Sequence, residues 1–364
     1  MRIPIFALSG GPCGGKSTGL IHLSEKLTEY GHRLLIVPEA ATLLIQSGIT
    51  PSVLPGEAFQ EHVFRTALFL EDETKRAALA MKNESPVIIC DRGLMDARAY
   101  VSQEVFAEVA TRCGFNSTVD IRDGRYDAVF YMQTAAKGAE KFYTTINNSA
   151  RRETAEEARI LDDTTFAAWN GHPHIWIIDN RADGFEGKLT RLLQAVCHSL
   201  GIPVPLEIEK KFLIARPDLN TLPVPWEAID IEQVYLTSSV PGEELRVRKR
   251  GQHGAYVYYR TVKQTLGRGI RAEREETITP KEYAEALKSQ DQFTVPVRKQ
   301  RICFAYKHQY CELDLFSEPS ASLAILEIEL TNKTDTVAFP PFLTCIEDVT
   351  EKVQYTNWSI ARGL

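Results

Sequence analysis

The sequence predicts two domains of different fold class: an α/β domain with a mostly parallel sheet, followed by an antiparallel β domain. The chain has 364 residues, and at about 150 residues per domain this length suggests two domains. Short apolar runs alternate with amphipathic segments up to about residue 200, and charged and apolar residues alternate after it. Because GIPVPL (201–206) separates the two patterns, we place the domains at 1–202 and 203–364.

The first domain is predicted from five short apolar runs with helix-like segments between them. The runs cover residues 3–8, 34–38, 87–90, 128–132 and 175–179. The intervening segments 18–29, 60–82 and 154–169 repeat apolar residues at spacings of three and four, as amphipathic helices do. Strands that alternate with helices in this way favour a parallel sheet covered on both faces.

The second domain is predicted from period-two alternation, which is typical of antiparallel strands. The alternating segments are 207–214, 244–250, 256–265, 271–278, 297–306, 310–316 and 324–330. A helix-like stretch, 280–289, interrupts them, and the Pro-rich segment between Lys211 and Arg246 is interpreted as a variable connection.

The composition of the chain argues against several classes of function. The chain has 42 Lys+Arg and 48 Asp+Glu, and this net charge of -6 does not favour a nucleic-acid surface. No apolar run approaches the roughly 18 residues of a membrane-spanning helix, so we expect no membrane partner. The seven scattered cysteines include no CxxC pair, which argues against a disulfide framework or structural zinc and fits a cytoplasmic protein.

A phosphate-binding loop is predicted at the end of the first strand. Residues 10–17 fit GxxxxGK[ST] and lie between a strand pattern and a helix pattern. In such a loop the backbone N–H groups bind phosphates, the lysine reaches the β/γ-phosphates and the hydroxyl binds Mg²⁺. We therefore expect ATP as substrate, bound by Gly10, Gly11, Pro12, Cys13, Gly14, Gly15, Lys16, Ser17 and Thr18, with Ser17 as a metal ligand.

Three further positions of the first domain are candidates, each with an ordinary alternative. Asp91 ends the third strand and is placed to hold Mg²⁺ or to accept a proton, unless it caps the next helix. Glu39 ends the second strand and has the same two interpretations. Arg151 and Arg152 open an acidic helix and suit a lid that meets the transferred phosphoryl group, unless that helix face is simply solvated.

These motifs resemble a known family. GGPCGGKST, VPEAA, CDRG and HIWIIDN are similar to P-loop kinase-like, AAA-like ATPase domains related to ribosylnicotinamide kinases of the NadR type and, more distantly, to thymidylate kinases. The resemblance covers residues 3–200. It implies that the domain binds and turns over ATP, and it leaves the phosphoryl acceptor open.

The second half places ionic side chains on one face of strand after strand. Glu207, Glu209 and Lys211 are spaced by two, so all three leave the same face of a strand. On one strand this indicates a solvated outer face. Repeated over seven strands it favours an enclosed, water-filled interior, in which bases hold phosphate oxygens and acids hold divalent cations.

The same residues resemble the CYTH, or triphosphate tunnel metalloenzyme, family over about residues 205–362. The motifs are EIEKK, RVR, TVK, RAERE, KQR, ELD and EIE. The resemblance implies an eight-stranded antiparallel β tunnel that binds a triphosphate lengthwise with Mg²⁺ or Mn²⁺. Its members include inorganic, thiamine and RNA triphosphatases and class IV adenylyl cyclases.

The resemblance also assigns site residues. It implies triphosphate binding by Lys211, Arg246, Arg248, Lys263, Arg271, Lys299 and Arg301. It implies metal binding by Glu207, Glu209, Glu273, Glu275, Asp314, Glu327 and Glu329. In the first domain, the place of Asp91 at the end of a strand makes it the expected metal ligand. The candidate catalytic residues are Glu207, Glu209, Lys211 and Asp91.

Both halves therefore point to phosphate chains and divalent metal. The leading hypothesis is an enzyme whose P-loop domain turns over ATP and whose tunnel hydrolyses inorganic polyphosphate or a triphosphate-bearing small molecule. The alternative is a P-loop small-molecule kinase or ATPase regulated by a tunnel that binds polyphosphate or nucleotide without turnover. A third interpretation is a kinase whose product or by-product the tunnel processes.

Overall fold

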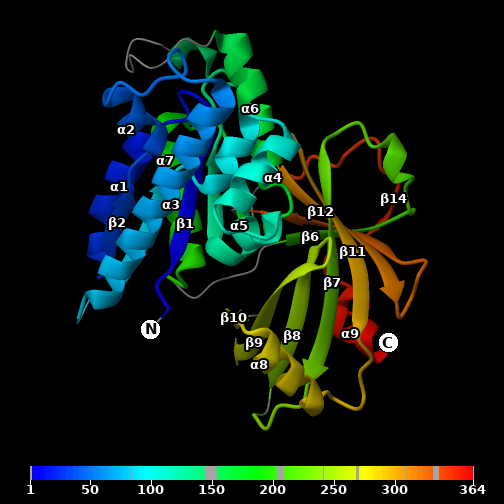
Figure 1. The fold of residues 1–364 in the computed structure, drawn as a ribbon. Coiled ribbons are helices and arrows are strands. Elements are labelled where there is room, and N and C mark those ends of the chain that lie inside the picture. The colour runs from blue at the N-terminus through cyan, green and yellow to red at the C-terminus, as the bar shows by residue number, and fades with distance from the viewer. Residues whose placement is uncertain are drawn as a thin grey trace. The chain divides into compact units, whose positions relative to one another are not determined.

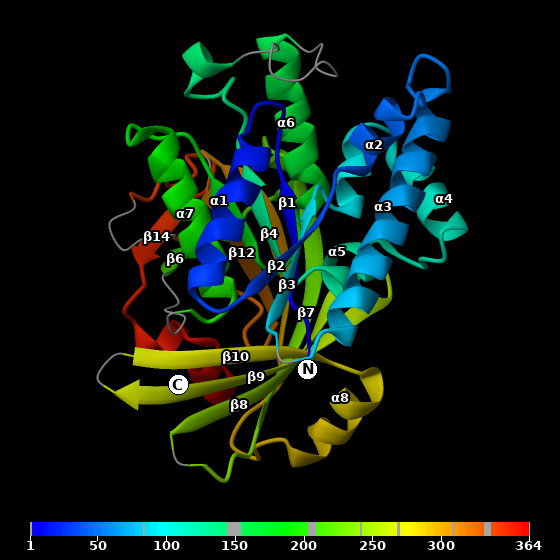
Figure 2. The same ribbon diagram turned by 90° about the vertical axis from the view of Figure 1, so that its left-hand side faces the viewer.

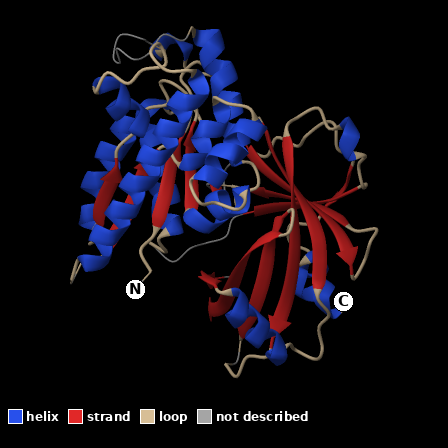
Figure 3. Ribbon diagram, in the orientation of Figure 1, coloured by secondary structure: helices blue, strands red, loops and turns tan. Residues whose placement is uncertain are grey.

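The computed structural model describes residues 2–82, 84–143, 154–202, 209–240, 242–267, 270–307, 309–330 and 336–363, without the side chains of 264–274 and 329. The chain divides into two compact units, Met1–Leu200 and Gly201–Leu364. Figure 3 shows their different composition, with helices packed around the strands of the first unit and mostly strands in the second.

The first unit (Figure 1) contains a five-stranded parallel sheet, and its strands follow the order β2-β3-β1-β4-β5. Its strands are β1 (Ile5–Ser9), β2 (Arg33–Val37), β3 (Pro86–Asp91), β4 (Ala128–Met132) and β5 (Ile175–Ile178). The first strand lies at the centre, fully buried between β3 and β4. The chain segments that follow β1 and β3 therefore emerge side by side at the carboxyl edge of the sheet, where ligands of open α/β sheets bind.

Helices cover both faces of this sheet. They are α1 (Lys16–Glu29), α2 (Ala40–Gln46), α3 (Gly56–Ala80), α4 (Gln103–Arg112), α5 (Thr118–Arg125), α6 (Ala155–Trp169) and α7 (Gly184–Ser199), with a short 3₁₀ helix η1 (Leu94–Ala99). Figure 2 shows α1 and α7 together on one side, and α3, α4 and α5 on the other. The predicted α/β class is confirmed, and each predicted strand lies within two residues of an observed one.

The second unit is built on a nine-stranded antiparallel sheet in the order β10-β9-β8-β7-β11-β12-β13-β6-β14. Its strands are β6 (Glu209–Ile214), β7 (Trp226–Leu236), β8 (Glu243–Gln252), β9 (Ala255–Gly267), β10 (Ile270–Ile278), β11 (Val297–Tyr306), β12 (Gln309–Glu318), β13 (Ala324–Glu329) and β14 (Cys345–Asp348). Two short helices, α8 (Pro280–Ala286) and α9 (Asn357–Arg362), complete it. The predicted antiparallel class is confirmed, with nine strands instead of eight.

One long strand was missed by the sequence analysis. We interpreted the Pro-rich segment between Lys211 and Arg246 as a variable connection, but β7 runs from Trp226 to Leu236 and pairs with β8 and β11 near the middle of the sheet. Pro217, Pro223 and Pro225 suggested a connection, and all three precede the strand. Because these prolines lie before the first paired residue of β7, they remove none of the hydrogen bonds between this strand and its neighbours.

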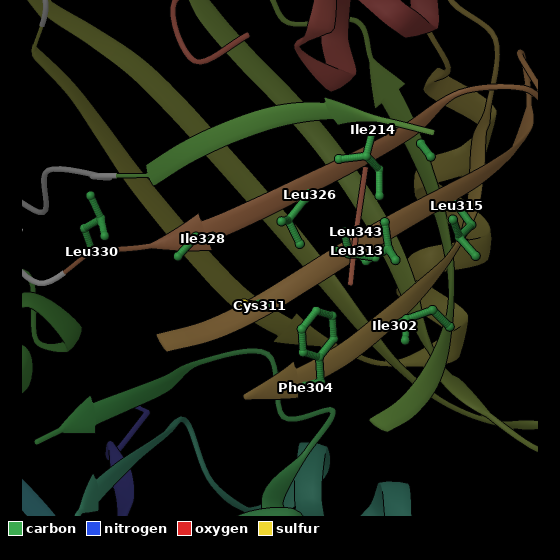
Figure 4. Packing of buried hydrophobic residues seen from close by; sticks show 11 residues of the cluster. Ile214, Ile302, Phe304, Cys311, Leu313, Leu315, Leu326, Ile328, Leu330 and Leu343 are labelled. Atoms are coloured by element: carbon green, nitrogen blue, oxygen red, sulfur yellow. The ribbon is translucent and has the colours of Figure 1, made fainter. Parts of the chain in front are cut away.

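The apolar core of the second unit lies on one face of β6, β11, β12 and β13. Ile214, Ile302, Phe304, Leu313 and Leu326 project from these neighbouring strands and pack together (Figure 4). Two irregular segments of the same unit cover them, with Leu219, Leu222 and Val224 from one and Val337, Phe339 and Phe342 from the other. Burial on this face leaves the opposite face of the same strands to the charged residues.

We predict that Phe304→Ala destabilises the second unit by about 3–5 kcal/mol, because it removes a fully buried ring from this core. Val353→Ala is the matched control, since its side chain is 68% exposed. Urea denaturation followed by circular dichroism measures both, and equal stability of the two variants would contradict the assignment of this core.

Candidate functional site

The phosphate-binding loop passes close to the backbone of β4. A Cβ atom at Gly10 would lie 2.0 Å from the carbonyl oxygen of Met132, so only glycine fits beside β4, and Gly10 has a φ of 138°. Cys13 and Gly15 also have positive φ, which curls the loop before α1. Helix α1 begins without a side-chain cap among the described residues. Its first N–H groups are therefore left for an anion.

Lys16 folds back over the loop. Its Nζ donates to the carbonyl oxygens of Gly10 at 2.9 Å and Gly11 at 3.2 Å. Burial, together with the positive charge of Arg92, lowers the pKa of Lys16 to about 8, despite the nearby Asp91 and Glu39 carboxylates. A bound polyanion would replace the carbonyl groups as the partner of this ammonium and would favour its charged form.

Asp91 lies at the end of β3, next to the loop in the sheet. Leu8 and Asp91 are register partners on β1 and β3. Burial raises the pKa of Asp91, and its Oδ1 atom is buried without a hydrogen-bond partner in the described part of the chain. The carboxylate that caps the following 3₁₀ helix is Asp96, which accepts from the Gly93 N–H at 2.9 Å. Asp91 is thus not used as a cap, and its free oxygen suits a metal ion or a substrate hydroxyl.

Glu39 differs from Asp91 because both of its carboxylate oxygens have partners. Its carboxylate pairs with Arg92 at 2.6 Å and accepts from the Thr42 hydroxyl, and it makes no cap hydrogen bond to α2. Burial alone would raise the pKa of Glu39, but the charges of Arg92 and Lys16 lower it to about 2. Glu39 is therefore a fixed anion that orients Arg92, and a poor proton acceptor at neutral pH.

Asp162 on α6 is a site residue that the sequence analysis missed. Its Oδ1 accepts from the backbone N–H groups of Gly11 and Thr134, both at 3.0 Å, and its Oδ2 pairs with Lys137 at 2.9 Å. A Cβ atom at Gly11 would lie 2.5 Å from this carboxylate. Asp162 thus joins the phosphate loop to the segment after β4. The sequence held no signal for it, because its partner Gly11 lies 151 residues away.

The ionic residues predicted to line the interior of the second unit lie at strand positions opposite to those of the apolar core, and most of the described ones are buried. In register across β6, β13, β12 and β11, Lys211 faces Glu327, Glu327 faces Glu312, and Asp314 faces Arg301. In the strands toward the β10 edge of the sheet, Arg246 of β8 faces Thr261 of β9, and Thr261 faces Glu275 of β10. The alternative of a solvated outer face does not fit these strands, because most of these ionic side chains are buried and buried ionic side chains require partners.

Lys211 lies between two carboxylates. Its Nζ is 2.9 Å from Glu209 Oε1 and 2.9 Å from Glu327 Oε1, and the side chains are 13%, 23% and 10% exposed, respectively. Burial alone would lower the pKa of Lys211, but the two carboxylates raise it. The sequence prediction that Glu209 and Lys211 share a face with Glu327 agrees with this geometry.

Arg301 organises the centre of the charged face. Its guanidinium donates to both oxygens of Asp314 at 2.7 Å, to Glu327 at 2.7 Å, and to Glu312. Asp314 also pairs with Lys299, whose Nζ donates to Asn357 at 3.1 Å. The structure therefore places Asp314, a predicted metal ligand, in ion pairs with two bases.

A second group of bases lies on β8 and β9. Arg248 pairs with Glu275 at 2.7 Å, and Glu275 accepts from the Thr261 hydroxyl at 2.8 Å. Arg246 is buried opposite Tyr235 of β7, and the Tyr235 hydroxyl accepts from Gln233. Tyr235 and Gln233 belong to the strand that the sequence analysis missed. Lys263 lies in register between Glu244 and Glu273.

Several predicted site residues lie outside the description. Glu207, Arg151 and Arg152 fall outside the described residues, as do the side chains of Arg271, Glu273 and Glu329. Within the described residues, no group of three or more His, Cys, Asp or Glu side chains is arranged to hold a metal ion. Of the predicted ligands that the structure describes, Glu209 and Glu327 converge on Lys211, and Asp314 and Glu327 converge on Arg301.

Comparison with known proteins assigns each half of the chain. A family model described as an AAA domain matches residues 5–186. The inorganic triphosphatase of Nitrosomonas europaea is 31% identical over 162 residues in the C-terminal part, which is 43% of this chain and 98% of that protein. The chain belongs to the AAA domain family and to the family of this inorganic triphosphatase. We call the two units the AAA domain and the triphosphatase-like domain.

Solved structures are also similar to the triphosphatase-like domain. A crystal structure of an inorganic triphosphatase is 27% identical and covers 44% of this chain and 96% of its own, with a TM-score of 0.33. A Pyrococcus horikoshii protein is 25% identical and covers 35% and 80%, with a TM-score of 0.27. The family assignment rests on the sequence match.

A helix that crosses a membrane has to be both long and apolar. None of the helices in the described part of the chain meets both requirements.

We predict that Lys16→Ala weakens ATP binding by the AAA domain at least about tenfold, because a charge-assisted hydrogen bond contributes about 1.5–3 kcal/mol. Isothermal titration calorimetry on the full chain measures the affinity. Lys26→Ala is the matched control, since Lys26 lies on the same helix and pairs with Glu29 at the surface. Equal affinities of the two variants would remove Lys16 from the binding site.

We also predict that ATP binding takes up a proton above pH 8. With a pKa of about 8, Lys16 loses its proton as the pH rises through 8, and bound phosphates favour the charged form. ATP affinity should therefore fall between pH 8 and 9.5, and the binding enthalpy should depend on the ionisation enthalpy of the buffer. Lys16→Arg keeps its charge over this range and should abolish the uptake. Proton uptake that persists in this variant would contradict the prediction.

Proposed function

We propose that the chain is a metal-dependent phosphohydrolase with two phosphate sites. The AAA domain binds and turns over ATP, and the triphosphatase-like domain hydrolyses inorganic tripolyphosphate or a triphosphate-bearing small molecule with Mg²⁺ or Mn²⁺. The observation that carries the proposal is the buried row of ionic side chains in which Lys211 lies between Glu209 and Glu327. The name of the Nitrosomonas relative supports the choice of substrate.

The residues fit a divalent cation in their chemistry. Carboxylate oxygens are the preferred ligands of Mg²⁺ and Mn²⁺, and those of Glu209 and Glu327 converge on one point, which the Lys211 ammonium fills. Glu207 and Glu329 are the remaining expected ligands. A bound divalent cation would polarise phosphoryl oxygens and add positive charge to offset that of the substrate.

The bases of the same face would bind and orient the triphosphate. Arg246 and Arg248 lie on β8 and Lys211 lies on β6, and guanidinium groups hold phosphate oxygens through paired hydrogen bonds. Fixed charges in an enclosed site stabilise the charge that develops on the transferred phosphoryl group more strongly than solvent does. Arg301 contributes by holding Glu327 in place.

In the AAA domain, Lys16 and the first N–H groups of α1 would bind the phosphates of ATP. Ser17 and Asp91 are the residues expected to hold its Mg²⁺. Asp91 suits this role because its buried Oδ1 has no partner among the described residues. The finer resemblance to ribosylnicotinamide kinases stays a prediction, and it leaves the phosphoryl acceptor open.

We predict that Glu209→Gln lowers metal-dependent phosphate release from tripolyphosphate at least about 100-fold and leaves ATP binding unchanged. The substitution removes a charge from the expected metal site, and ligand changes of this kind are typically severe. A colorimetric phosphate assay with Mg²⁺, with Mn²⁺ and with EDTA measures the activity.

Glu318→Gln is the control for this experiment. Glu318 pairs with Arg298, and both side chains are about half exposed, so its loss should leave the activity unchanged. Tripolyphosphate hydrolysis that survives Glu209→Gln, or that persists in EDTA, would refute the catalytic tunnel. Binding of tripolyphosphate without turnover by the unaltered chain would favour the sensing alternative.

A further inference from the structure

The ammonium of Lys211 lies where the carboxylates of the expected metal site converge. Glu209 and Glu327 each direct Oε1 to Lys211 Nζ, at 2.9 Å in both cases. They come from adjacent antiparallel strands, β6 and β13, in which Lys211 is the register partner of Glu327. The sequence places Glu209 and Lys211 two residues apart on one strand, so this grouping follows from the strand geometry and does not need a loop.

One cation at a time fits between these carboxylates. The Glu209 and Glu327 side chains are mostly buried, and two buried carboxylates that converge without a cation repel each other. A divalent cation is bound by carboxylate oxygens at about 2.0–2.6 Å and would need the same oxygens. The ammonium and the divalent cation therefore compete for one position.

The rest of the network holds the carboxylates in place while this exchange occurs. Glu327 uses Oε2 for Arg301, at 2.7 Å, and only Oε1 for Lys211. Arg301 is itself fixed by Asp314 and Glu312. Lys211, by contrast, carries its charge on a flexible four-carbon stem. Its departure would leave Glu327 oriented by Arg301.

We propose that Lys211 is an internal counter-ion that fills the divalent-cation site until the cation binds, and that its release toward the phosphates makes metal binding and triphosphate binding positively cooperative. This inference rests on the proposed function. Each ligand removes a different competitor: the metal displaces the ammonium from the carboxylates, and the triphosphate draws the ammonium away from them. By linkage, each then raises the affinity of the other by the same factor.

Mn²⁺ binding to the full chain tests the competition directly, without turnover. Free Mn²⁺ is measured by electron paramagnetic resonance, in the absence of nucleotide and triphosphate, for the unaltered chain and for Lys211→Met. Removal of the competing ammonium should tighten Mn²⁺ binding about tenfold or more. Lys210→Met is the matched control. Lys210 is the next residue of β6, its side chain is 42% exposed near Asp348, and its loss should leave the affinity unchanged.

The reciprocal titration supplies a second arm that uses the unaltered chain as well. Imidotriphosphate, which has P–N–P bridges that resist hydrolysis, should raise the Mn²⁺ affinity of the unaltered chain about tenfold or more, within the usual range of coupling between sites. In Lys211→Met this factor should be clearly smaller. If Lys211→Met does not fold, the two-way titration of the unaltered chain still decides, because equal Mn²⁺ affinities with and without imidotriphosphate overturn the proposal.

The outcomes separate this inference from the proposed function. If the unaltered chain binds both Mn²⁺ and imidotriphosphate, and Glu327→Gln weakens Mn²⁺ binding, the site is as proposed. Unchanged or weaker Mn²⁺ binding in Lys211→Met then overturns the counter-ion role alone. If the unaltered chain binds neither ligand, both the function and the inference fail.

Discussion

The second unit depends on the neutralisation of buried charge on one face of its sheet. Arg301 is the clearest case: one guanidinium bonds to Asp314, Glu327 and Glu312, three carboxylates from two adjacent strands. Although burial raises the pKa of Glu327, the charges of Lys211, Arg301 and Lys299 hold it well below its usual range. These bases thus keep Glu327 ionised, and removal of a single member would leave an uncompensated buried charge.

In the AAA domain, buried carboxylates accept hydrogen bonds from backbone N–H groups. Asp162 holds the Gly11 and Thr134 N–H groups, and Asp96 holds the Gly93 N–H and pairs with Arg92 at 3.2 Å. These carboxylates fix the two loops that follow β1 and β3. Because the loops are already in place, little conformational entropy is lost when a phosphate chain binds, and this raises the affinity.

The sequence predicted the architecture well because the hydrophobic period changes from the helical spacing to two near residue 203. Local patterns also located the phosphate loop, Asp91 and the strand faces that carry Lys211 and Arg301. They could not tell which charges neutralise each other. Asp314 fits a metal ligand by spacing, yet its oxygens bond to Arg301 and Lys299. Asp162 and β7 were missed for two reasons, a contact distant in sequence and prolines that lie just outside a strand.

The position of the apolar core has a consequence for how such a protein changes over time. Phe304, Leu313 and Leu326 pack on the side of the sheet away from the charges, against segments of the same unit. The hydrophobic layer and the ionic side chains therefore occupy opposite sides of the same strands, and under the proposed function the ionic side binds the substrate. Mutations that exchange one ionic pair for another leave the hydrophobic layer intact, so a lineage with this arrangement is free to explore new anionic substrates without losing its fold.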